Sequence, residues 1–146
     1  MADNKQQAPP SPENKVLVSK QFKEETLNKV EDQIKLFQQT GALVLPPNYI
    51  AENALRAAWV VLLETEDKDG RPVLEVCTKT SICNALLKMV VYGLNPVKKQ
   101  CDFIAYGNKL VCTPEYTGNI LLAKRYGDLK EINAQVVYKG ETFITA

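Results

Sequence analysis

The chain contains no histidine, and this absence removes a large part of enzyme chemistry. Histidine is the commonest general base near neutral pH and the commonest metal ligand. A serine or cysteine nucleophile that is activated by an imidazole therefore cannot be built from this sequence. An enzyme of this composition would have to use carboxylates, lysine or tyrosine for its proton transfers.

Paired cysteine motifs and long apolar runs are missing as well. None of the four cysteines (Cys77, Cys83, Cys101 and Cys112) forms a CxxC pair, which disfavours a zinc site. The opening sequence MADNKQQAPPSPENK lacks the apolar segment of a secretory signal, so we expect buried, reduced thiols. The longest apolar run, AAWVVLL, is too short to cross a bilayer. We predict no metal, no cofactor and no membrane association.

The sequence also lacks a strong excess of one charge. It has 18 Lys+Arg and 17 Asp+Glu among 146 residues, so a general attraction to nucleic acid is excluded, and any attraction must come from local clustering. A composition of 45% hydrophobic and 24% charged residues is typical of a globular protein, and the length suits one domain. We predict a flexible arm over residues 1–19 and a single domain over residues 20–146.

Apolar residues recur at helical spacing in three segments. The first is Lys20–Gln39, and the second follows the chain-breaking sequence LPPN at 45–48. The third is predicted to be capped by Thr80 or Ser81 and to end at Gly93, which suits a left-handed stop. Trp59 lies beside the apolar stripe of the second helix, where it is either half-buried or a contact residue. The predicted buried positions are Leu27, Val30, Ile34, Phe37, Ile50, Ala54, Ala58, Val61, Leu62, Ile82, Ala85, Leu86, Met89 and Val90.

The periodicity then changes to that of strands. CDFIAY and KLVCT flank Gly107 and Asn108, a two-residue hairpin signal, and Pro114 ends the second strand. TGNILLAKRYG predicts a short helix, and EINAQVVYKGETFITA predicts two more strands around a Lys139–Gly140 turn. The predicted fold class is α+β, with N-terminal helices followed by an antiparallel β-β-α-β-β core.

The acidic segment ETEDKDGRP at 64–72 is predicted to be a solvated turn. Its carboxylates could hold a metal for a hydrolase, but their spacing does not match a calcium-binding loop. We rank this enzyme hypothesis last and predict no catalytic residue.

Basic and aromatic residues gather in the second half of the chain. The stretch from Lys79 to Leu110 contains five lysines and one acidic residue, Asp102. The predicted hairpin within it carries Phe103 and Tyr106. Single-stranded nucleic acid needs cations along its phosphates and flat side chains for its bases, so this stretch favours nucleic-acid binding. Alternatively, the lysines only keep a sheet edge soluble and the aromatic side chains belong to the core.

Four motifs in this region resemble the RecT family of phage recombinases, the single-strand annealing proteins. They are TSICNALLKMVVYGLNP (80–96), KKQCDFIAYGNKL (98–110), EYTGNILLAKRYG (115–127) and EINAQVV (131–137). The resemblance implies ATP-independent binding of single-stranded DNA and annealing of complementary strands during recombination. It also implies rings or helical filaments of identical subunits, a partner exonuclease from the same phage, and the cytoplasm of a bacterial host.

The resemblance implies a set of DNA contacts on the basic hairpin and the short helix. Arg125 is expected to contact a phosphate or, alternatively, to form an intramolecular salt bridge. Tyr116 is expected to stack on a base or, alternatively, to pack beneath the hairpin, and Gly118 to permit close backbone approach. The predicted DNA-binding residues are Lys98, Lys99, Lys109, Tyr116, Lys124 and Arg125.

Two departures from the family pattern accompany the resemblance. Glu115 and Thr117 stand where many members have glycine and a basic residue, and the Glu115 carboxylate would repel a phosphate. Members also continue beyond the point where this chain ends with GETFITA, so we expect part of the DNA groove and of the subunit interface to be missing. The alternative function is a non-catalytic protein-interaction module without affinity for nucleic acid.

Overall fold

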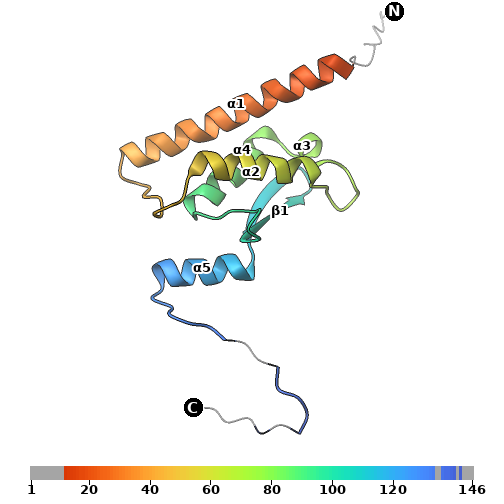
Figure 1. The fold of residues 1–146 in the computed structure, drawn as a ribbon. Helices are drawn as coiled ribbons and strands as arrows, with labels where there is room; N and C mark the ends of the chain where they lie inside the picture. The colour runs from red at the N-terminus through yellow and green to blue at the C-terminus, as the bar shows by residue number, and fades with distance from the viewer. Residues whose placement is uncertain (1–11, 134–135, 141, 143–146) are drawn as a thin grey trace, which may run out of the picture.

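The computed structural model describes residues 12–133, 136–140 and 142. Helices dominate the first two thirds of the chain, and a two-stranded antiparallel sheet and a final helix follow (Figure 1). The predicted α+β class is therefore confirmed. The elements are α1 (Pro12–Gln39), α2 (Ala51–Glu64), α3 (Val73–Val76), α4 (Lys79–Val91), β1 (Cys101–Tyr106), β2 (Lys109–Pro114) and α5 (Tyr116–Tyr126).

Helix α1 begins earlier than the sequence analysis predicted. Residues 12–19, assigned there to a flexible arm, are helical, while residues 1–11 lie outside the described part of the chain. Pro12 is compatible with the first turn of a helix because the N–H that proline lacks has no intrahelical acceptor there. No glycine or further proline follows before Gln39, so nothing in the sequence interrupts the helix.

The hydrophobic core forms where α1 and α2 pack against α4. Leu55, Leu62 and Leu86 are fully buried there, and burial of each such side chain contributes about 1.5–3 kcal/mol. Most of the predicted core positions are confirmed, but Ile50 is 60% exposed because it precedes the first turn of α2. Trp59 is buried, whereas the sequence analysis predicted either a half-buried or a contact residue. The centroid of its ring lies 6.0 Å from that of Phe22.

The start of α4 is fixed by Thr78, not by Thr80 or Ser81. Thr78 is the N-cap, and its side-chain oxygen accepts a hydrogen bond from the Ser81 N–H at 3.3 Å. The predicted cap was wrong because Thr80 and Ser81 already lie within the first helical turn. Ser81 instead links α4 to the sheet, since its Oγ accepts from the Leu110 N–H at 3.1 Å.

The hairpin and the end of α4 agree with the prediction. Tyr106 pairs with Lys109 across the two-residue turn, and Gly107 has a φ of 62°. Gly93, with a φ of 65°, follows the last turn of α4 in the left-handed conformation. The buried face of the sheet carries Cys101, Phe103, Leu110 and Cys112.

The second predicted pair of strands is not formed in the part of the chain that the structure describes. Residues 131–133 and 136–138 belong to no strand, although residues 139 and 140 do form the expected turn. Figure 1 shows this segment extending away from the helices, so it has no adjacent strand with which to pair. Residues 134–135, 141 and 143–146 of the predicted strands lie outside the description.

The acidic segment at 64–72 is a tight turn organised by one carboxylate. Asp67 Oδ1 accepts from the backbone N–H groups of Asp69 and Arg71, each at 2.9 Å. Its other oxygen, Oδ2, accepts from the Arg71 guanidinium at 2.7 Å. The short helix α3, which the sequence analysis did not predict, follows immediately.

Candidate nucleic-acid interface

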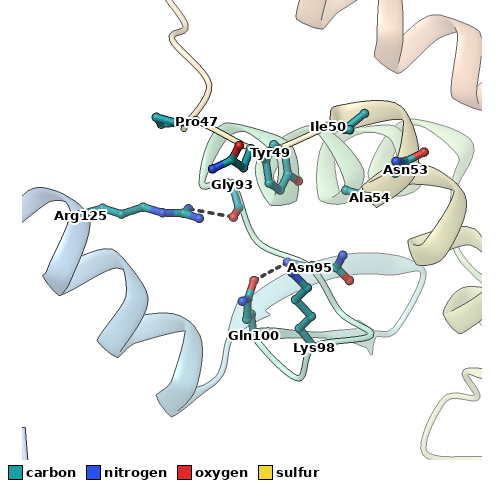
Figure 2. A pocket seen from close by; sticks show the side chains of 11 residues that line it. Pro47, Tyr49, Ile50, Asn53, Ala54, Gly93, Asn95, Lys98, Gln100 and Arg125 are labelled. Atoms are coloured by element: carbon teal, nitrogen blue, oxygen red, sulfur yellow. Dashed lines mark hydrogen bonds between the residues drawn. The ribbon is translucent and has the colours of Figure 1, made fainter.

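A cleft of about 220 Å³ lies where the start of α2, the loop after α4 and the last turn of α5 meet. We call it the α2–α5 cleft. Figure 2 shows that its lining residues come from segments that are far apart in the sequence. The lining residues that matter below are Tyr49, Asn53, Asn95, Lys98, Gln100 and Arg125.

Helix α5 is attached to the hairpin by contacts with the backbone at its first turn. The Glu115 N–H donates to the Gln100 carbonyl oxygen at 3.0 Å, and the Thr117 hydroxyl donates to the Lys99 carbonyl. A Cβ atom at Gly118 would overlap the Gln100 carbonyl oxygen, so only glycine allows this approach. The predicted role of Gly118 is thereby confirmed.

Arg125 attaches the other end of α5 to α4. Its Nη1 donates to the carbonyl oxygen of Gly93 at 2.9 Å (Figure 2). It also donates to the carbonyl oxygen of Tyr92 at 3.5 Å. A cation at the C-terminal end of a helix is stabilised by the unpaired carbonyl groups there. The predicted alternative for Arg125, an intramolecular salt bridge, was wrong because its partners are carbonyl oxygens rather than carboxylates.

Gly93 also makes room for this contact. A Cβ atom at Gly93 would lie 2.7 Å from Arg125 Nη1 and 2.9 Å from the Pro46 side chain. Any other residue would therefore displace the guanidinium, in addition to the cost of its positive φ. Gly93 thus serves both the end of α4 and the wall of the cleft.

Lys98 and Lys99 lie in the loop between α4 and β1, and both side chains are exposed. Neither forms an ion pair with another residue that the structure describes. Lys99 has a φ of 55°, an uncommon conformation for a residue with a side chain. Lys98 and Arg125 both line the cleft, so the structure places these two predicted DNA contacts at one site.

The remaining predicted contacts lie elsewhere. Lys109 is at the turn end of the hairpin, roughly 17 Å from its base if β1 rises about 3.3 Å per residue. Lys124 is exposed on α5 but does not line the cleft. Tyr116 is 74% exposed, so the alternative in which it packs beneath the hairpin was wrong.

A carboxylate pair lies beside Lys99. A hydrogen bond with Asp102 raises the pKa of Glu115, whereas the nearby charge of Lys99 lowers it. Glu115 therefore lies close to Lys99, and its negative charge opposes a phosphate at that lysine. Lys98, which lines the cleft, is therefore better placed than Lys99 to contact a phosphate.

The sequence analysis missed the uncharged residues of the cleft. Tyr49 donates its hydroxyl hydrogen to the Leu94 carbonyl at 2.9 Å, and burial raises its pKa. Asn95 and Gln100 form hydrogen bonds with the loop backbone. The Asn-Pro turn at 95–96 was a visible signal, but only the folded chain brings residues 49 and 53 next to it.

The described part of the chain contains neither a cluster of metal-ligating groups nor a helix that could span a membrane. No three histidine, cysteine or carboxylate groups converge there as a metal site would require. No helix among the described residues is long and apolar enough to span a membrane. What the cleft offers is positive charge and hydrogen-bond donors, an arrangement suited to binding an anion.

Comparison with known proteins identifies the family. The model of the RecT family matches residues 52–146, more than half of the chain, and this match includes α2 to α5 and the basic loop. Among curated proteins and solved structures, none matches the chain. On the strength of the family match, the chain belongs to the RecT family, whose members anneal single strands of DNA in recombination.

Proposed function

We propose that this chain binds single-stranded DNA and anneals complementary strands without ATP, with the basic loop at 98–99 and the α2–α5 cleft as the contact region. The single observation that carries the proposal is the RecT match over a segment whose basic loop exposes Lys98 and Lys99, neither of which forms an ion pair with another described residue. Arg125 contributes charge to the same region while it holds α5 in place.

Annealing requires no bond to be made or broken by the protein. The protein neutralises the sugar-phosphate backbone and keeps the bases available for pairing. Pairing then supplies on the order of 1.4 kcal/mol per stacked base-pair step, and complementarity of the strands provides the specificity. The sequence contains no GxxxxGK[ST] phosphate-binding loop, in keeping with a reaction driven by pairing alone.

Three further residues are proposed as DNA contacts outside the cleft. Lys109 and Lys124 are exposed cations, and Tyr116 is exposed enough to stack on a base, a contact worth about 1–3 kcal/mol. We also propose that identical subunits assemble as a ring or filament, so that a neighbour continues the track. On the strength of the family alone, we also propose that the chain works beside an exonuclease of the same phage and acts in the cytoplasm of a bacterial host.

The first prediction concerns the basic loop. The double variant Lys98→Ala/Lys99→Ala should bind a single-stranded oligonucleotide about tenfold more weakly. The slope of its log affinity against log salt concentration should be shallower by about 1.4, because two phosphates are no longer neutralised. Fluorescence anisotropy at several salt concentrations measures both, and annealing of complementary oligonucleotides should slow in parallel.

The matched control is Lys29→Ala/Lys35→Ala, which removes two exposed lysines from α1. It should bind and anneal like the parent chain. If the loop variant anneals as fast as this control, the site assignment is wrong. If the parent chain itself shows no affinity for single strands at low salt, the protein-interaction alternative is favoured.

A further inference from the structure

Two of the amide side chains that line the α2–α5 cleft, those of Asn95 and Gln100, have fixed orientations. Gln100 Oε1 accepts from the Asn95 N–H at 2.9 Å, and Asn95 Oδ1 accepts from the Val97 N–H at 3.0 Å. Each amide oxygen accepts from a backbone N–H, which fixes the positions of the oxygen and nitrogen atoms in the amide. The NH₂ group of each side chain can then donate to another partner. Each of these lining residues therefore keeps its NH₂ group as a donor for a ligand.

The charged residues of the cleft have the same polarity. Lys98 and Arg125 line it, and none of its lining residues is an aspartate or glutamate. The cleft therefore combines two positive charges with several N–H donors, a combination that suits an anion.

The size of the cleft limits what it can hold. Its volume of about 220 Å³ is below the roughly 300–1,000 Å³ of pockets that enclose drug-sized ligands. A guanidinium and an ammonium group are the side chains that proteins use most often for phosphate, with Arg binding as a fork and Lys as a point charge. A single phosphate group matches the charge, the donors and the volume together.

We propose that the α2–α5 cleft binds one phosphate group, with the NH₂ groups of Asn95 and Gln100 as donors beside Lys98 and Arg125. This inference rests on the proposed function, because it makes the cleft the point where one phosphate of the strand is held. The phosphate can be an internal phosphodiester or the end of a strand, and both present the same anionic oxygens.

Isosteric substitutions test the inference without removing a structural hydrogen bond. Gln100→Glu and Asn95→Asp each keep the oxygen that accepts from the backbone, but replace the NH₂ donor with a negatively charged oxygen. Each should bind single-stranded DNA at least about tenfold more weakly at fixed salt. The control Gln21→Glu makes the same charge change on the exposed surface of α1 and should bind like the parent.

The measurement is anisotropy with an oligonucleotide carrying either a 5′-phosphate or a 5′-hydroxyl, with circular dichroism to verify folding. Tighter binding of the phosphorylated strand that Gln100→Glu abolishes assigns the cleft to a strand end. Equal loss of affinity for both oligonucleotides assigns it to an internal phosphate. If Gln100→Glu binds both as tightly as Gln21→Glu does, the inference is overturned.

A second measurement separates this inference from the proposed function. Inorganic phosphate is titrated into isotope-labelled protein while the side-chain amide signals of Asn95 and Gln100 are followed by NMR. If the parent chain binds no DNA, the proposed function fails, yet a phosphate-dependent shift of the Asn95 signal that is absent in Gln100→Glu still supports the cleft. If the parent binds no DNA and these signals do not shift, the inference fails too.

Discussion

At the scale of single residues, Gly118 decides how closely α5 approaches the hairpin. Because the Gln100 carbonyl oxygen occupies the space of a side chain, Gly118→Ala must push the helix away and strain the hydrogen bond from Glu115. We expect a loss of about 1–3 kcal/mol in the free energy of unfolding, the usual cost of overpacking. Denaturation in urea, followed by circular dichroism, measures it.

The control for this substitution is Asn119→Ala, the next residue along the same helix. Asn119 is exposed, and alanine has a higher helix propensity than asparagine, so this variant should be as stable as the parent chain or slightly more so. Equal stability of the two alanine variants would mean that α5 does not need its close contact with Gln100.

At the scale of elements, the start of α4 depends on one threonine. Thr78→Ala removes the side-chain acceptor for the Ser81 N–H and should cost about 1 kcal/mol of stability. Thr80→Ala is the natural control because Thr80 is exposed within the first turn. It should leave the free energy of unfolding within about 0.5 kcal/mol of the parent value. A larger loss for Thr80→Ala than for Thr78→Ala would contradict the assignment of the cap.

The turn at 64–72 should make stability depend on pH. Hydrogen bonds from the Arg71 backbone and side chain hold the pKa of Asp67 below its ordinary value of 3.8. The ionised carboxylate therefore stabilises the fold above that value, and this stabilisation is lost as the pH falls through the lowered pKa of the folded state.

Asp67→Asn should accordingly melt at a lower temperature than the parent chain at pH 7. The difference should shrink as the pH falls below 3.8. Melting curves across this range measure it, and Arg71→Gln should give the same trend because it removes the ion pair from the other side. A difference that stays constant with pH would rule out the ionised carboxylate as its cause.

The sequence predicted the elements whose signals are local. The Gly-Asn turn defined the hairpin and Gly93 marked the end of α4, both through conformational limits on a few adjacent residues. The cap of α4 was misplaced by a few residues because threonines stand at both 78 and 80 and either satisfies the pattern.

The candidate site was less predictable because it is assembled by tertiary structure. Lysines 98 and 109 belong to one basic stretch in sequence, yet the hairpin places them at opposite ends. Arg125 was singled out for its charge, but its carbonyl partners at 92 and 93 follow only from the docking of α5 on α4. The donor character of Asn95 depends on a backbone hydrogen bond that the sequence does not reveal.

At the scale of the whole molecule, α1 contributes to a core that is continuous with α2 and α4. Ile34 is 3% exposed, so Ile34→Ala should cost about 2–5 kcal/mol by leaving a cavity. Leu36→Ala, at a 49% exposed position on the same helix, is the control and should cost much less.

The only tryptophan allows this prediction to be checked with two probes. Trp59 lies between α1 and the rest of the core, close to Phe22, so its fluorescence reports the docking of α1. In Ile34→Ala the fluorescence and far-ultraviolet dichroism should change at the same denaturant concentration, as expected for one cooperative unit. Loss of the fluorescence signal well before the dichroism signal would show that α1 detaches independently.

The four cysteines have a consequence for experiments on this protein. All of them are buried with free thiols, and burial raises the pKa of both Cys77 and Cys83. Maleimide dyes react with accessible thiolates, so the natural cysteines should stay unlabelled in the folded chain. A single cysteine introduced on an exposed surface, such as position 35, could then carry a fluorophore for watching strands meet in real time, with the native thiols left in place.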